Sequence, residues 1–195
     1  MKLTTLCLVL AVAAAGVIGC ATNDGDDGSW TTVAEADLTP AQQQQLDRAM
    51  EARKILFSRL STKLKSTLEE AGPVEAIGVC KDAAPVIAEE VSEEHGLRIG
   101  RTSFKLRNPE NVAPDWAKSV VEDRVSENTY LAGPGGELGV MLPIRVQAPC
   151  LTCHGGEEDI PAEVQASLAN YYPEDDGTGF TVEDLRGWFW IEVGS

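Results

Sequence analysis

The pentapeptide Cys150-Leu151-Thr152-Cys153-His154 constrains the fold of this chain more than any other stretch. Its C-x-x-C-H spacing is the attachment signature of c-type haem. Two thiols three positions apart can each add to one vinyl group of the porphyrin, and the next residue places an imidazole beneath the iron. The motif therefore predicts one covalently attached haem c, bound by Cys150 and Cys153, with His154 as a ligand of the iron.

The amino terminus has the features of an export signal. One cation, Lys2, precedes an apolar run from Leu6 to Gly19 that contains no charge, as in secretory signal peptides. Cys20 directly follows this run and resembles the lipobox cysteine of bacterial lipoproteins. We therefore expect a lipoprotein signal peptide over residues 1–19 and an exported protein, anchored to the cell envelope by lipid on Cys20. The alternative is an uncleaved membrane anchor, since about 17 apolar residues can just span a bilayer.

The cysteine count agrees with this assignment. Of the five cysteines, Cys7 leaves with the signal, Cys20 takes the lipid, and Cys150 and Cys153 take the haem, which leaves Cys80 unassigned. An odd free thiol is a liability in an oxidising compartment, so Cys80 is notable.

Charge and length limit the classes of partner and the number of domains. The chain has 16 basic and 31 acidic side chains, a net charge of −15. This charge opposes binding to nucleic acid or anionic lipid headgroups and fits a solvated acidic surface or a basic redox partner protein. Residues 20–38, rich in Asp, Gly, Thr and Asn, are expected to form a flexible acidic tether. One domain is then expected over residues 39–195.

Two helices are predicted at the start of this domain. Thr39-Pro40 is a helix start signal and Gly72-Pro73 a stop signal. Between them, apolar residues recur at helical spacing and are expected to form the buried face: Leu46, Met50, Phe57, Leu60, Leu64 and Leu68. A second helix is predicted over residues 73–95, with Cys80 on its apolar face and a kink caused by Pro85.

The remaining elements predict an α+β fold, with an antiparallel sheet flanked by helices and a long N-terminal amphipathic helix. Strands are expected at residues 97–104, 129–132, 138–146 and 185–193, and shorter helices at residues 114–125 and 161–172. Gly133-Pro134-Gly135-Gly136 is a hairpin signal between two of the strands. Residues 174–179 are expected to form a turn, because their spacing does not match a calcium-binding loop.

Five blocks of sequence carry a family resemblance: Gly78-Val79-Cys80, Ala84-Pro85-Val86-Ile87-Ala88, Ile99-Gly100-Arg101-Thr102-Ser103-Phe104-Lys105-Leu106-Arg107-Asn108-Pro109, Cys150-Leu151-Thr152-Cys153-His154-Gly155 and Leu185-Arg186-Gly187. Over about residues 46–193 the chain resembles the haem-c PAS-like domains, formerly a domain of unknown function. The resemblance implies a PAS-like sheet and an iron held between a histidine and a cysteine thiolate. Carried over to this sequence, these axial ligands are His154 and Cys80.

With both axial positions filled, we expect electron transfer or redox sensing rather than an enzyme. A haem-based sensor of NO or CO is the alternative, in which the gas displaces Cys80 from reduced iron. A further alternative is a non-haem exported protein in which Cys80, Cys150, Cys153 and a histidine hold a structural zinc ion. Cys150 and Cys153 could also form a plain disulfide.

Other side chains are weaker candidates. Arg101, Lys105 and Arg107 are candidate contacts to the haem propionates, because cationic side chains pair with carboxylates. The alternative for all three is a salt bridge to acidic residues of the protein. For Cys80 the alternative role is an inert buried thiol. His95 is expected to be exposed at a helix end, and Met141 is expected to be a core residue.

Overall fold

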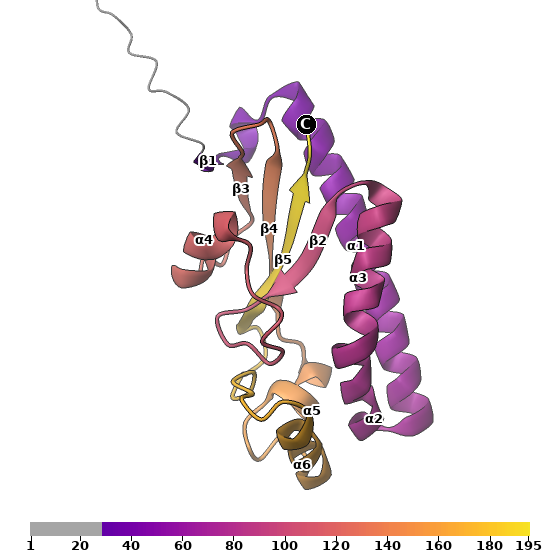
Figure 1. Cartoon of the computed structure of the whole chain (residues 1–195). Coiled ribbons are helices and arrows are strands. Elements are labelled where there is room, and N and C mark those ends of the chain that lie inside the picture. Colours follow the sequence, from indigo (N-terminus) through magenta and orange to yellow (C-terminus); the bar gives the residue numbers. More distant parts are fainter. Residues whose placement is uncertain (1–28) are drawn as a thin grey trace, which may run out of the picture.

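The computed structural model describes residues 29–195 and is built on a five-stranded antiparallel sheet in the order β1-β3-β4-β5-β2 (Figure 1). The strands are β1 (Thr31–Val33), β2 (Arg98–Thr102), β3 (Thr129–Ala132), β4 (Leu138–Arg145) and β5 (Leu185–Val193). The predicted α+β class is confirmed. The predicted signal peptide, Cys20 and the first part of the predicted tether lie outside the described residues.

The chain joins the sheet earlier than its composition predicts. Residues 29–38 are expected in the tether, yet Thr31–Val33 pairs antiparallel with Tyr130–Ala132. Glu35 then accepts a 2.7 Å hydrogen bond from the hydroxyl of Tyr130. The tether prediction is therefore wrong for this part of the chain. The reason is that an exposed sheet edge offers unpaired backbone groups, and a segment can pair with them without a large apolar pattern.

Two helical segments lie side by side along one face of the sheet (Figure 1). The first is α1 (Pro40–Ala71), which begins with a capping box between Thr39 and Gln42. The second consists of α2 (Pro73–Gly78), a π-helical turn (Val79–Ala83) and α3 (Ala84–His95). A regular helix with a kink is expected here, and the structure has a π-helical turn in that place.

The side chains of β5 divide the core into two layers, because successive residues of a strand face opposite sides. Phe189, Ile191 and Val193 pack against α1 and α3. Trp188 and Trp190 face the other side, where the core is completed by a 3₁₀ turn (Asp115–Ala117) and α4 (Lys118–Glu122). Met141 is 0% exposed in this second layer, so its predicted core position is confirmed.

The buried face of α1 differs from the predicted stripe. The buried residues of this helix are Gln45, Leu46, Ala49, Ala52 and Leu56. Met50 and Phe57, which are predicted to be buried, are 42% and 45% exposed. The prediction is confirmed for Leu46 and wrong for Met50 and Phe57. Alanines weigh little in an apolar pattern, although their small side chains let the helix pack closely on the sheet.

Truncation of two adjacent residues of α1 is expected to lower the stability of the protein by very different amounts. Leu56 is 0% exposed, and Leu56→Ala is expected to lower the free energy of unfolding by about 2–5 kcal/mol. Phe57→Ala removes a larger side chain that remains in contact with water, and its cost is expected to be below about 1 kcal/mol. Chemical denaturation of both variants measures the difference. A larger loss for Phe57→Ala would show that the predicted stripe is the buried face after all.

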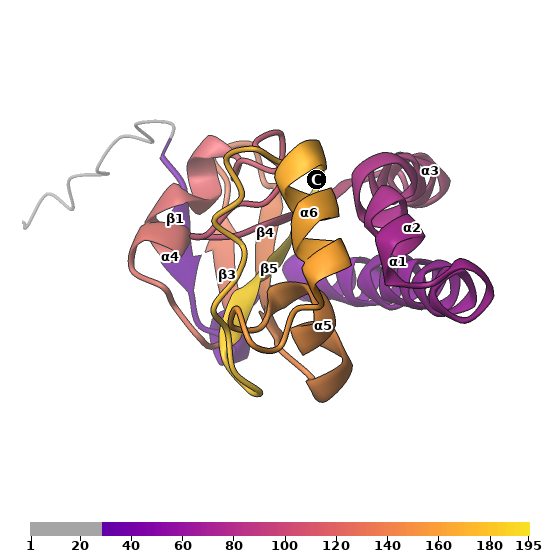
Figure 2. The same cartoon turned by 90° about the horizontal axis from the view of Figure 1, so that it is seen from below.

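A small lobe covers the end of the sheet where β4 ends and β5 begins (Figure 2). It contains α5 (Leu151–His154) and α6 (Ala162–Tyr171). An apolar cluster joins this lobe to α2, and its members are Ile77, Ile160, Val164, Leu168 and Tyr172, with Cys153 packed against them. Between residues 29 and 195, no helix combines the length and apolarity needed to cross a membrane.

Candidate functional site

Cys150, Cys153 and His154 lie on one helical turn of the small lobe, which we call the attachment turn (residues 148–154). A 3₁₀ turn, Ala148–Cys150, runs directly into α5. Residues three apart on a helical turn share one face, so Cys150 and Cys153 are neighbours. Both are free and partly exposed thiols. The disulfide considered from the sequence is not formed.

The imidazole of His154 forms a hydrogen bond with a main-chain carbonyl. Its Nδ1 lies 2.7 Å from the oxygen of Gly177. Because a carbonyl oxygen only accepts hydrogen bonds, we assign the ring proton to Nδ1, which leaves the lone pair on Nε2. Burial, reinforced by the charges of Arg186 and Arg107, lowers the pKa of His154 to about 3. The ring is therefore neutral near pH 7, the form that ligates metals.

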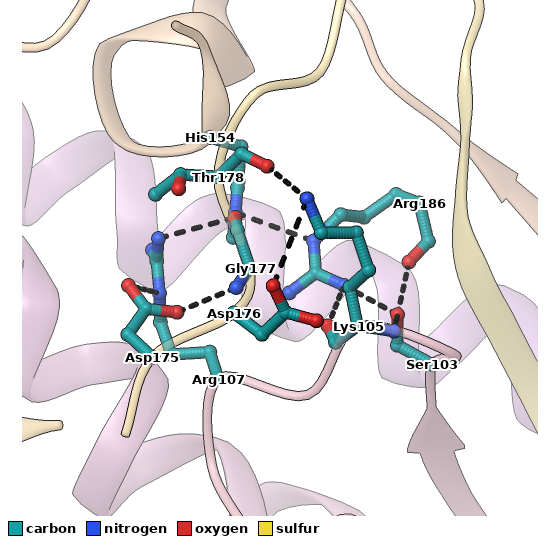
Figure 3. Close-up of polar contacts among 9 residues, drawn as sticks. All are labelled: Ser103, Lys105, Arg107, His154, Asp175, Asp176, Gly177, Thr178 and Arg186. Atoms are coloured by element: carbon teal, nitrogen blue, oxygen red, sulfur yellow. Dashed lines mark hydrogen bonds and ion pairs between the residues drawn. The ribbon is translucent and has the colours of Figure 1, made fainter. Parts of the chain in front are cut away.

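Gly177 is itself fixed by Arg107 and Asp175 (Figure 3). Nε of Arg107 donates to Oδ2 of Asp175 at 3.0 Å, and Oδ1 of Asp175 accepts the N–H of Gly177 at 2.7 Å. Nη2 of Arg107 donates to the carbonyls of Cys153 at 2.6 Å and Gly177 at 3.3 Å. One guanidinium thus connects the attachment turn to the loop that holds the imidazole.

Arg186 lies on the other side of the histidine ring (Figure 3). Its Nη1 donates to Oγ of Ser103 at 2.7 Å and to the carbonyl of Lys105 at 3.0 Å. Its Nε lies 3.2 Å from Nδ1 of His154. Two N–H groups cannot bond to each other, and the shorter contact with Gly177 fixes the proton on the histidine. Burial lowers the pKa of Arg186 to about 10, so the guanidinium remains charged near pH 7.

A cleft opens beside the attachment turn and is lined in part by Cys150 and His154. Four arginines also line it, and they are Arg101, Arg107, Arg145 and Arg186. This concentration of positive charge is unusual in a chain with a net charge of −15. Clustered guanidinium groups attract anions and match the geometry of carboxylates. The cleft therefore suits a ligand with carboxylate groups.

The structure separates the three residues predicted as propionate contacts. Arg107 forms the ion pair with Asp175, which is the salt-bridge alternative considered from the sequence. Lys105 donates from Nζ to the carbonyl of Thr178 at 2.6 Å and lies 3.9 Å from Asp176. Arg101 lines the cleft, and within residues 29–195 its side chain forms no ion pair. Arg101 is therefore the one of the three whose charge has no acidic partner there.

Cys80 lies in the π-helical turn between α2 and α3 and is a partly exposed free thiol. Pro85 lacks the N–H that a regular helix would require at the next turn, which accounts for the wider turn. The helix directly before this turn is α2, and its residue Ile77 belongs to the apolar cluster against which Cys153 packs. Turns of this kind are frequent at functional sites.

The second histidine of the chain lies far from this region. His95 is the last residue of α3, at the end of the helix opposite to α5 (Figure 1). It is partly exposed, and its carbonyl accepts a 3.1 Å hydrogen bond from Arg48.

A structural zinc site is one of the alternatives that the sequence leaves open. Among residues 29–195, no group of three or more His, Cys, Asp or Glu side chains is placed to hold a metal ion.

Sequence reasoning missed the residues that hold the imidazole. Asp175 and Gly177 belong to a segment predicted only as a turn, and Arg186 appears only within a block of the family resemblance. Gly177 is a residue type that could have indicated this close packing from the sequence. A Cβ atom at Gly177 would lie 2.8 Å from Nη2 of Arg186 and 3.1 Å from Cβ of Arg107. A larger residue at this position would therefore require the side chain of Arg186 to move and Arg107 to shift slightly.

Together, the fold and the site define an α+β domain with an antiparallel sheet and a Cys/His attachment turn beside an arginine-lined cleft. The Tll0287-like family model matches residues 32–194, and the chain belongs to this family. The family resemblance seen in the sequence is thereby confirmed. A solved structure, titled as the crystal structure of the cyanobacterial heme-protein Tll0287, is 24% identical with a TM-score of 0.59, over 81% of this chain and 98% of that chain. No curated protein matches the chain.

Proposed function

We propose that this protein is a membrane-tethered monohaem c-type cytochrome that acts in electron transfer or redox sensing. The observation that carries the proposal is an imidazole whose Nδ1 is bound by the carbonyl of Gly177, directly after two free thiols on the same turn. Cys150 and Cys153 form the thioethers, while His154 and Cys80 are the axial ligands. The similarity to a solved cyanobacterial haem protein supports this assignment.

The residues of the site fit such a cofactor. Bound haem supplies a reversible one-electron change at its iron. His154 presents Nε2, because Nδ1 is engaged by Gly177. Phe180 contacts the edge of the imidazole, with ring centroids 6.5 Å apart, and limits its rotation. Arg101 is available for a carboxylate in the cleft. A thiolate such as that of Cys80 stabilises ferric over ferrous iron, so we expect a low reduction potential.

A sensor of NO or CO is a second candidate, and the position of Cys80 is the observation that favours it. The π-helical turn that carries Cys80 departs from regular helical hydrogen bonding. Such a turn can change conformation more readily than a regular helix, which suits a ligand that leaves the iron on reduction. An exchangeable ligand gives the two states that a switch requires.

The test of the proposed function uses the full-length chain, produced in cells that can mature c-type cytochromes. Haem is expected to remain with the polypeptide on a denaturing gel, because thioether bonds survive denaturation. The stained band is expected in the membrane fraction for the native chain and in the soluble fraction for Cys20→Ser, since lipid on Cys20 provides the anchor. Cells without the maturation system serve as the control. A purified native chain that lacks covalent haem would rule out the proposal.

A further inference from the structure

The orientation of His154 depends on residues that are far from it in the sequence. The carbonyl of Gly177 faces two donors at once, Nδ1 of His154 and Nη2 of Arg107. The N–H of the same glycine is bound by Asp175. Both backbone polar groups of Gly177 are therefore engaged, and their direction is set by the pair formed by Arg107 and Asp175 (Figure 3).

The guanidinium of Arg107 also forms a hydrogen bond with the attachment turn. Its contact with the carbonyl of Cys153, at 2.6 Å, is the shortest of its hydrogen bonds. A planar guanidinium directs its N–H groups at fixed angles, whereas an ammonium group is a point charge. Arg107 therefore sets the position of the turn that carries the thiols relative to the loop that carries the imidazole acceptor.

Burial distinguishes this ion pair from the others among the described residues. The side chains of Arg107 and Asp175 are 8% and 11% exposed. The pair formed by Arg59 and Glu94 has comparable geometry, with contacts of 2.9 and 2.7 Å, but its side chains are 38% and 48% exposed. A buried pair often adds little net stability, because desolvation offsets the attraction. A role in positioning explains why the pair is buried at this place.

We propose that Arg107 is a positioning residue that fixes both the imidazole of His154, through Gly177, and the attachment turn, through Cys153. This inference rests on the proposed function, in which His154 is the ligand of the haem iron. The consequence is a site whose thiols and imidazole are aligned by the protein itself. Metal ligands held in this way are stronger donors, and loss of the holding contact typically changes affinity by about 10–100-fold.

The test compares full-length native protein with Arg107→Gln, Arg107→Lys and the matched surface variant Arg59→Gln. The first measurement is the solvent exchange rate of the Nδ1 proton of His154 by NMR. We expect exchange at least tenfold faster in Arg107→Gln, an intermediate rate in Arg107→Lys, and no change in Arg59→Gln. The second measurement is the midpoint potential. We expect it to rise in Arg107→Lys, which keeps the positive charge but loses the planar donor geometry, and a tenfold loss of ferric over ferrous affinity equals about 59 mV.

Each outcome decides the proposal. Faster exchange together with a raised potential supports it. An unchanged exchange rate overturns it, even where the melting temperature falls, because the contribution of Arg107 is then to stability alone. If Arg107→Gln does not fold, Asp175→Asn replaces it, and the same increase in exchange is expected. If the native chain carries no haem, the proposed function fails, while the exchange rate of the same chains still supports or overturns the positioning role.

Discussion

Replacement of both Cys150 and Cys153 by alanine is expected to abolish the haem signal on a denaturing gel. In the proposed site the two thiols provide the covalent links, so in the double variant no bond would hold the cofactor once the chain is unfolded. Each single variant retains one possible thioether and is expected to keep a reduced signal. Haem stain normalised to protein measures the loss.

Cys80→Ala is the matched control, because it removes the third free thiol of the described residues without touching the attachment turn. Its haem stain is expected to equal that of the native chain. Cys153 also packs against the apolar cluster of α2 and α6, so a thermal melt of each variant separates lost attachment from lost stability. Full staining of a folded double variant would exclude thioether attachment at these positions.

Local signals account for the parts of the fold that the sequence predicts well. The capping box at Thr39 and the glycine after Ala71 mark both ends of α1. The alternation of large side chains between residues 185 and 193 predicts β5 with its observed bounds. Caps and strand alternation depend on neighbours in the chain, which a single sequence displays.

The residues around His154 depend on contacts that a single sequence does not display. Arg107, Asp175 and Arg186 come from three loops or strand ends, and the distances along the chain between bonded partners reach 83 residues. No periodicity links such positions. The spacing of C-x-x-C-H predicts the ligand, whereas the hydrogen bond that orients it, from Nδ1 to Gly177, arises only from tertiary packing.

The acidic composition likewise conceals the character of the site. A net charge of −15 predicts an acidic surface, yet the cleft next to His154 is lined by four arginines. Of these, Arg107 has a buried acidic partner. The net charge therefore indicates which partner proteins the outer surface attracts. The arginines of the cleft indicate an anionic ligand at that site.

Replacement of Cys80 by alanine is expected to change the ferric low-spin EPR spectrum and to raise the midpoint potential. The thiolate is the axial ligand that favours ferric iron in the proposed site, so its removal is expected to shift the potential by more than the about 59 mV that a tenfold change in affinity produces. The matched control is Lys81→Ala, an exposed neighbour in the same π-helical turn. This variant is expected to keep the native spectrum and potential.

Binding of CO to the reduced protein then decides between the two candidate functions. If Cys80 remains bound after reduction, the native chain is expected to take up CO slowly and Cys80→Ala rapidly, as in an electron carrier. Rapid and complete uptake by the native chain would favour the gas sensor, because the π-helical turn then releases its cysteine on reduction. A ferric spectrum that is identical in the native chain and in Cys80→Ala would remove Cys80 from the iron. The second ligand of the iron would then have to come from another residue, and the gas sensor would lose its proposed switch.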